Sequence, residues 1–332
     1  MRATPSRITL ISLLLLAVLL AVCLLSLTAG PAHLQSGAVL RELLGMRVLN
    51  DTSRTILLKI RLPRILLGAL VGGTLAVAGV VFQALLRNPL AEPFILGISG
   101  GAAFGAILGI LLGWAFFPGV MGASFAGALA TIVLVMGIAR GNARIQTNVL
   151  LLSGVIVNAF FSAAIMFLIA ITRNHKIHNI LHWLMGDLGF AAFKEVAVLL
   201  PLVLVGLAFV YGTARPLNLM VAGEETAIHL GVRVERLKKT LFVLVSLIVS
   251  AVVCLSGIIG FVGLIIPHAL RFLVGSDHRL LLPTAFFSGA AFLVICDMLA
   301  RTLTYQGELP VGVLTALFGG PFFIYLIRRT LE

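Results

Sequence analysis

The stretch RLPRILLGALVGGTLAVAGVVFQALLRNPLAEPFILGISGGA, from Arg61 to Ala102, holds the pattern that decides the fold. Residues 65–86 form an uninterrupted apolar run, and about 20 such residues are enough for an α-helix to cross a bilayer. Pro89 and Pro93 then keep the residues between them out of a continuous helix, because proline cannot donate the helical hydrogen bond. The pattern predicts a membrane-spanning helix, a tight turn and a second helix.

The second of these helices carries a face of small residues. Small side chains let the backbones of membrane helices approach closely, so such a face indicates tight packing. The same segment could instead form a constriction at the inner mouth of a transport pathway, and the spacing alone leaves both interpretations open. The glycines of this face are Gly97, Gly100, Gly101, Gly105 and Gly109.

The composition extends the membrane interpretation to the whole chain. Of its 332 residues, 60% are hydrophobic and 11% are charged. A soluble domain carries roughly 25% charged residues, so this chain cannot cover a surface that faces water. The sequence therefore predicts a polytopic membrane protein. Its net charge of +12 suggests loops that face anionic lipid or an acidic partner. Nucleic acid is a much less favoured partner for these basic loops.

Ten membrane crossings account for the apolar segments. The segment 240–274 is too long for one crossing, and Gly257, Gly260, Gly263 and Pro267 interrupt its helix continuity. It is therefore predicted to hold two spans, of which the second is short and broken. The other eight apolar runs lie near residues 9–29, 65–86, 94–115, 117–139, 148–172, 196–213, 281–303 and 309–327.

Basic residues at the two ends predict the topology. Arg2 and Arg7 place the N-terminus in the cytoplasm, and Arg328 with Arg329 place the C-terminus there. Both ends on one side require an even number of crossings, which ten satisfies. The first apolar run is longer than the ~7–15 residues of a signal-peptide core, so we expect a retained span. The predicted fold class is an all-α polytopic membrane protein with about ten transmembrane helices, in which residues 1–332 form one transmembrane domain.

This topology leaves many bases outside the cytoplasm. Ten of the 24 Lys and Arg residues fall on the outer side, and six of these ten lie between the first two spans. Cytoplasmic loops normally carry the excess of such residues. The weak bias suggests that something on the outer side needs these bases.

One charged island interrupts the apolar sequence. The segment GEETAIHLGVRVERLKK, residues 223–239, belongs to a stretch, 217–239, that the topology places in the cytoplasm between spans six and seven. Glu224 and Glu225 start a short helix where its dipole favours anions, and Gly231 is placed to end it. So short a helix is unstable alone in water, so it needs a surface to lie on. The residues favour a cytosolic partner over the membrane as that surface.

The chain lacks the motifs of membrane-bound catalysis. The full sequence contains no GxxxxGK[ST] phosphate loop, no HExxH metal motif and no GxSxG nucleophile elbow. The cysteines Cys23, Cys254 and Cys296 lie in apolar runs without metal-like spacing. We therefore expect no catalytic residue, no metal site and no cofactor in this chain.

Asp297 is the clearest ionisable residue inside a predicted span. Arg301 follows it by four residues, so the two side chains share a helix face and can form an ion pair. A proton or cation relay is the alternative, but a relay usually needs further partners. His268 follows Pro267 near a helix break, and structural hydrogen bonding is favoured there over a ligand role.

The motifs that carry a family resemblance follow one another along most of the chain. The chain resembles the FecCD-type ABC transporter permeases, which are the permease subunits of importers for iron–siderophore, haem and vitamin B12 complexes. The resemblance covers residues from about 35 to the C-terminus. Besides the opening stretch, the matching motifs are WLMGDLG, GEETAIHLGV, GFVGLIIPHALRFLVGSDHRLLLP, DMLAR and ELPVGVLTALFGGPFFIYLIRR.

The resemblance implies a type II ABC importer permease with ten helices per subunit in the inner (cytoplasmic) membrane. It implies a homodimer, two copies of a cytosolic ATPase that uses ATP-Mg, and a periplasmic or lipid-anchored substrate-binding protein. The expected cargo is a ferric siderophore or haem-type chelate, and cobalamin is the alternative. A secondary, ion-coupled carrier is the alternative from another class, against which the scarcity of buried titratable residues argues.

The resemblance also assigns roles to individual residues. The loop between spans six and seven forms a helix that couples the permease to the ATPase. Within that helix, the spacing of three residues between Ala227 and Leu230 places both on one face. The coupling residues are Gly223, Glu224, Glu225, Ala227, Leu230 and Gly231. The residues that pair with glutamates of the binding protein are Arg61, Arg64 and Arg301. The cytoplasmic gate residues are Asn88, Leu90, Gln146, Thr147 and Asn148, and the match is best at Thr147.

Overall fold

The computed structural model describes residues 4–30, 32, 34–139, 147–172, 174–303 and 307–331, and all regular secondary structure within these ranges is helical. Short π-helical segments are labelled η. The elements are α1 (Pro5–Thr28), α2 (Ser36–Leu43), α3 (Asp51–Thr55), η1 (Ile56–Arg61), α4 (Leu62–Leu86), α5 (Ile98–Leu111), η2 (Phe116–Val120), α6 (Met121–Ala139), α7 (Thr147–Ile171), α8 (Asn174–Leu184), α9 (Phe193–Gly212), α10 (Ala214–Ala222), α11 (Glu224–His229), α12 (Val234–Ser256), α13 (Val262–Val274), α14 (His278–Thr302) and α15 (Val311–Leu331).

The described residues contain the ten apolar helices that the sequence predicts. Seven are long and apolar enough to cross a membrane: α1, the continuous helix from α3 to α4, η2 with α6, α7, α9, α12 and α14. Three shorter apolar helices, α5, α13 and α15, complete the set. The prediction of an all-α membrane protein with about ten transmembrane helices is therefore confirmed.

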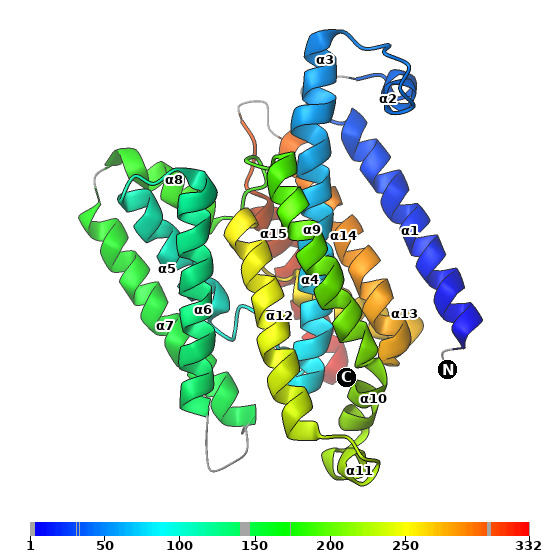
Figure 1. The fold of residues 1–332 in the computed structure, drawn as a ribbon, viewed down its shortest axis with the longest axis vertical. Helices are drawn as coiled ribbons and strands as arrows, with labels where there is room; N and C mark the ends of the chain where they lie inside the picture. Colours follow the sequence, from blue (N-terminus) through cyan, green and yellow to red (C-terminus); the bar gives the residue numbers. More distant parts are fainter. Residues whose placement is uncertain are drawn as a thin grey trace.

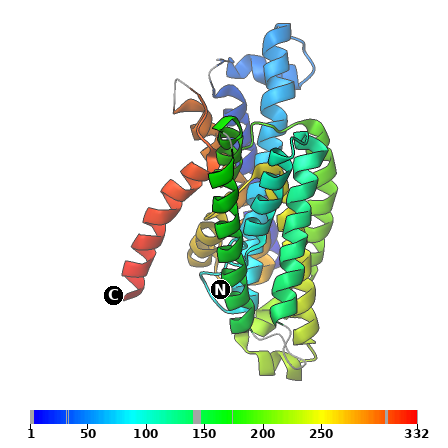
Figure 2. The same ribbon diagram turned by 90° about the vertical axis from the view of Figure 1, so that its left-hand side faces the viewer.

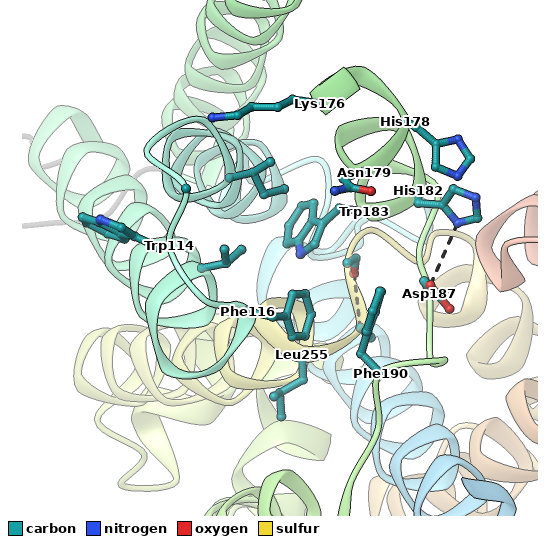
Figure 3. Close-up of a pocket in the computed structure, with 15 residues that line it drawn as sticks. Trp114, Phe116, Lys176, His178, Asn179, His182, Trp183, Asp187, Phe190 and Leu255 are labelled. Atoms are coloured by element: carbon teal, nitrogen blue, oxygen red, sulfur yellow. Dashed lines mark hydrogen bonds and ion pairs between the residues drawn. The ribbon is translucent and has the colours of Figure 1, made fainter. Parts of the chain in front are cut away.

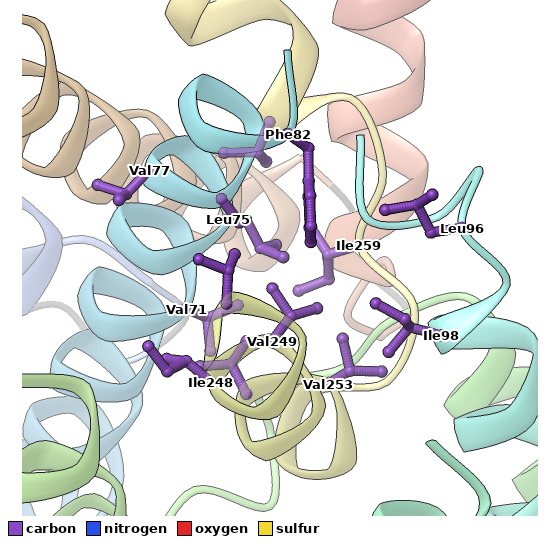
Figure 4. Close-up of a cluster of buried hydrophobic side chains, with 14 of the residues drawn as sticks. Val71, Leu75, Val77, Phe82, Leu96, Ile98, Ile248, Val249, Val253 and Ile259 are labelled. Carbon is purple, nitrogen blue, oxygen red and sulfur yellow. The ribbon is translucent and has the colours of Figure 1, made fainter. Parts of the chain in front are cut away.

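The helix that contains α4 is the centre of the molecule. It begins where the Asn50 Oδ1 atom accepts a hydrogen bond from the Ser53 N–H at 2.8 Å, and it ends where Arg87 takes a left-handed conformation. In its most apolar window 89% of the residues are buried, against 6% for α1. Figure 4 shows α4 side chains such as Val71 and Phe82 meeting Val249 of α12 in the core.

Glycines allow the neighbouring helices to lie directly against α4. A side-chain carbon added at Gly72 would collide with the Gly289 carbonyl oxygen of α14, and one added at Gly79 would collide with that of Gly263 in α13. The small-residue face of α5 is packed in the same way. A carbon at Gly101 would collide with α6. The close packing predicted from the glycine spacing is therefore confirmed.

The segment 240–274 forms two helices, as predicted. The helix α12 ends at Ser256 and α13 starts at Val262, so the five residues between them leave the helical path. Gly257 has a φ of 66°, and a side chain there would collide with the Trp183 carbonyl oxygen at the end of α8. The break thus brings α8 against the end of α12.

The two ends of the molecule differ in character. Figure 1 shows α2, α3 and α8 at one end, called the outer end below, and α10 with α11 at the other, called the inner end. The start of α1 and the end of α15 both lie toward the inner end, as an even number of crossings requires. Figure 2 shows α15 leaning away from the remaining helices.

Candidate functional site

The helix α11 is fixed to the inner end by an ion pair. The Lys238 ammonium of α12 donates to both carboxylate oxygens of Glu224, at 2.8 and 2.9 Å. The Arg87 guanidinium at the end of α4 lies 4.0 Å from the same carboxylate. Lys238 is buried and Glu224 is partly exposed, so solvent screens this pair only in part, and the pair holds α11 close to the start of the loop that follows α4.

The structure corrects the expected face of α11. Ala227 is 0% exposed and packs with the core between α10 and α12, whereas Leu230 is 61% exposed. The two residues therefore do not share a face, because the helix ends at His229 and its last turn directs the next residue outward. Ile228, which is 56% exposed, lies on the outward side with Leu230. Ala227 anchors the helix, and Ile228 and Leu230 form its free apolar surface.

The loop between α4 and α5 is ordered by its own side chains. The Asn88 Oδ1 atom accepts a hydrogen bond from the Leu90 N–H at 2.9 Å, which closes a tight turn, and the Leu90 side chain is exposed. Among the other predicted gate residues, Gln146 lies outside the described residues. Thr147 is the first residue of α7, its side chain is not described, and Asn148 is exposed beside it. The gate assignment stays a prediction.

Glu92 in the same loop is a buried carboxyl that sequence reasoning missed. Its carboxylate accepts a hydrogen bond from the Phe261 N–H at the start of α13, while its Oε2 atom has no hydrogen-bond partner among the described residues. Burial raises the pKa of Glu92 from 4.5 to about 7, and the Phe261 hydrogen bond lowers it in part. The residue lies between two prolines, and this position gives no local signal of burial.

This carboxyl predicts a pH dependence of stability. The pKa of Glu92 is higher in the folded protein than its ordinary 4.5, so the folded state holds the proton more tightly. Stability is therefore greatest below pH 4.5 for this group and is lost as the pH rises through about 7. We expect Glu92→Gln to flatten this part of the pH profile, measured by thermal unfolding of the purified protein. If the unfolding midpoint changed equally with pH in the variant and in the parent protein, a buried, protonated Glu92 would be contradicted.

The outer end holds a buried cluster of charges between α4 and α14. The Arg64 Nε–H donates to Asp297 Oδ1 at 2.8 Å, and the Arg301 Nε–H donates to Asp297 Oδ2 at 3.0 Å. Arg64 also donates to Glu308 Oε2 at 2.5 Å. The predicted Asp297–Arg301 ion pair is therefore confirmed. Both oxygens of Asp297 are occupied by arginines, which favours the structural interpretation of this acid over a relay.

Arg61 and Arg301 connect this cluster to the end of α1. Arg61 donates to the carbonyl oxygens of Leu27 and Ala32 at 2.7 and 2.6 Å, and Arg301 donates to Ser26 Oγ at 2.6 Å. The last carbonyl groups of a helix have no partner within the helix, so Arg61 satisfies one of them. Through these bonds α1, α4 and α14 are joined at the outer end.

The three arginines expected to contact a partner lie at the outer end of the molecule, but their side chains are buried there. Arg61, Arg64 and Arg301 are all buried, and their guanidinium groups bond within the chain. A reversal of charge at these positions would therefore act on folding as well as on docking. The pairings join residues up to 275 positions apart, so no local spacing could reveal most of them. Their docking role stays a prediction.

Comparisons with known proteins agree with this architecture. The sequence profile of the FecCD transport family matches residues 17–329. The chain is similar to the cobalamin import system permease protein BtuC of Halobacterium salinarum, with 46% identity over 278 residues, 84% of this chain and 74% of the relative. It is also similar to the hemin transport system permease protein HmuU of Yersinia pestis, with 40% identity over 323 residues, 94% of this chain and 95% of the relative.

A solved structure shows the same fold. It is described as an inward-facing conformation of a metal-chelate type ABC transporter, and it aligns with a TM-score of 0.86 and 32% identity. The alignment covers 96% of this chain and 99% of the solved one. Because the profile spans nearly the whole sequence and both relatives far exceed 30% identity, the chain belongs to the FecCD transport family.

Proposed function

We propose that this protein is the permease subunit of an ATP-driven importer in the inner membrane, and that it moves a ferric-siderophore or haem-type metal chelate into the cytoplasm. It works as a homodimer with two copies of a cytosolic ATPase and receives its cargo from a periplasmic or lipid-anchored binding protein. Transport follows alternating access, both termini are cytoplasmic, and ATP-Mg is used by the ATPase alone. The ten-helix fold and the membership in a transport family support this proposal.

The free apolar surface of α11 carries the coupling part of the proposal. Ile228 and Leu230 are exposed at the inner end, while Glu224 is tied to Lys238 and lies near Arg87. A partner that binds this surface and moves α11 would act directly on the end of α4. Asn88 and Leu90, the proposed gate residues, follow Arg87 along the chain, so the movement would reach the gate without an intermediate element.

The names of the relatives support a metal-chelate cargo. One relative is named for hemin and another for cobalamin, and the solved structure is described as of metal-chelate type. Cobalamin is the second candidate, favoured by the 46% identity to the halobacterial relative. For docking, Arg64 remains the best-placed residue, because Glu308, its partner at the surface, is half-exposed and an acidic group of the binding protein could replace it.

The coupling surface can be tested with two substitutions. We expect the double variant Ile228→Asp, Leu230→Asp to reach the membrane normally but to lose its ATPase. Loss of two apolar interface anchors costs roughly 2 kcal/mol or more, which weakens binding by about thirtyfold or more. The measurement is the amount of ATPase retained on affinity-purified permease after co-expression.

The matched control places the same substitutions at the opposite end. Leu44→Asp with Met46→Asp changes two apolar residues that are equally exposed, at the outer end near α2. This control should retain the ATPase in full. If the α11 variant also retains it, α11 rests on lipid and the coupling proposal is wrong.

A further inference from the structure

A cavity of about 700 Å³ opens at the outer end of this chain. Figure 3 shows it beneath α8, between the end of α5, the segment η2 and the end of α12. Pockets of ~300–1,000 Å³ hold most small organic ligands in proteins. Neither the buried arginine cluster nor the gate loop contributes a residue to its wall, so the proposed transport machinery does not account for it.

Aromatic rings form much of the cavity wall. Trp114 and Phe190 line it with exposed rings, and Phe116 stacks on Phe190 with ring centroids 4.9 Å apart. Trp183 is only 5% exposed, and its indole Nε1–H has no hydrogen-bond partner among the described residues. A buried donor without a partner is costly, and Figure 3 shows the Trp183 ring at the centre of the lining residues. The wall therefore suits a flat apolar ligand that carries a hydrogen-bond acceptor.

Two histidines stand at the edge of this cavity. His178 and His182 are one turn apart on α8, with ring centroids 4.5 Å apart, and both line the cavity. The Asp187 carboxylate lies 4.0 Å from His182 Nδ1, which is beyond hydrogen-bond distance, so it faces that nitrogen without fixing the ring. Asp187 faces Nδ1 rather than Nε2 of His182, and imidazole nitrogen is a good ligand for iron.

The surroundings decide between a bare metal ion and a metal chelate. Among the described residues, no three His, Cys, Asp or Glu side chains gather as a metal site. A metal bound by one or two imidazoles must then bring its remaining ligands with it. Lys176, six residues before His182 and so about 9 Å along the helix, donates to the Leu111 carbonyl oxygen and keeps other N–H donors for an anionic group.

We propose that this cavity binds a planar, anionic metal chelate of porphyrin size, stacked on its aromatic walls, with the metal coordinated by His182 or His178. Trp183 and Lys176 receive the acidic groups at the edge of the ring. The proposal rests on the proposed transport function and specifies one of its cargo classes, the metalloporphyrins. Cobalamin, with its nucleotide tail, is too large to be enclosed there.

The test compares two ligands that differ only in the metal. Full-length permease in lipid nanodiscs is titrated with ferric haem, followed by the absorption change that imidazole ligation causes, and with metal-free protoporphyrin IX, followed by fluorescence. We expect His178→Ala with His182→Ala to abolish the absorption change and to weaken haem binding by at least about tenfold, as loss of metal coordination commonly does. Its affinity for metal-free protoporphyrin should be unchanged. Trp183→Phe, which keeps an aromatic ring but removes the N–H donor, should weaken the binding of both ligands.

The control is His229→Ala, an exposed histidine at the inner end, which should bind haem as the parent protein does. Equal haem binding by the double histidine variant, or equal losses in the control, would overturn the proposal and indicate partition into lipid. ATP-driven uptake of a ferric siderophore without any haem binding would overturn this site and leave the transport function intact. Haem binding that depends on the histidines, without uptake of any chelate, would support the site and contradict the transport function.

Discussion

Replacing Asp297 with alanine is expected to remove most of the folded protein from the membrane. The substitution leaves Arg301 without its carboxylate and Arg64 with Glu308 alone, and both guanidinium groups stay buried. Removing one partner of a buried ion pair costs about 3–5 kcal/mol. Typical stabilities are only about 5–15 kcal/mol, so a loss of this size depletes the folded state. The measurement is the yield of monodisperse protein after detergent extraction, together with its thermal unfolding midpoint.

Two further variants make this result specific. Asp51→Ala removes an exposed aspartate at the start of α3 and should leave yield and unfolding unchanged. Asp297→Asn keeps the size of the side chain and some of its hydrogen bonds, so its yield and unfolding midpoint should lie between those of the parent protein and of Asp297→Ala. Normal yield and unfolding of Asp297→Ala would contradict the structural role of the cluster. If such a folded variant also lost transport, the relay interpretation of Asp297 would be favoured instead.

Much of the fold could be predicted because its causes are local. An apolar run such as residues 65–86 must cross the bilayer whatever surrounds it, since only a helix satisfies its backbone there. The break between α12 and α13 follows from glycines within the segment itself. The glycine face of α5 predicts close packing, although the partner helices, α6 and α7, could not be named from the spacing.

The candidate sites were less predictable because their contacts are distant in sequence. Arg64 meets Asp297 and Glu308 only after more than 230 residues have been folded into place, so its burial has no local sign. Ala227 is buried because α10 and α12 pack against α11, and the positions of these helices cannot be read from the local sequence. Glu92 is buried because the start of α13 covers it, and Lys238 pairs with Glu224 across fourteen residues. The Asp297–Arg301 pair was predictable, since four residues along a helix bring two side chains together.

Uptake of cargo by this protein is expected to depend entirely on ATP hydrolysed by a second polypeptide. The chain has no phosphate loop in its sequence, so it cannot hold ATP by that route. Coupling to a proton gradient would need an ionisable group that is free to exchange its proton within the membrane. Asp297 has both oxygens bound to arginines, so among the described residues such coupling would have to use another buried group, such as Glu92 or His278, each of which has a side-chain atom without a hydrogen-bond partner.

The cargo can be identified in the same system. Ferric hydroxamate siderophore, haem and cobalamin, each labelled on the metal, are supplied in turn with the binding protein. We expect the siderophore or haem to accumulate and to be displaced by an excess of the same unlabelled chelate. Accumulation of cobalamin alone would establish the alternative cargo while leaving the mechanism unchanged.

The most direct test of the transport mechanism is uptake into proteoliposomes under two energy sources. One set holds the permease with its ATPase and enclosed ATP, and the other holds the permease alone under an imposed proton gradient. Labelled chelate is added outside with the binding protein. The account predicts accumulation in the first set and none in the second. Accumulation at the same rate by the permease alone, driven by the proton gradient, would contradict it and identify a secondary carrier.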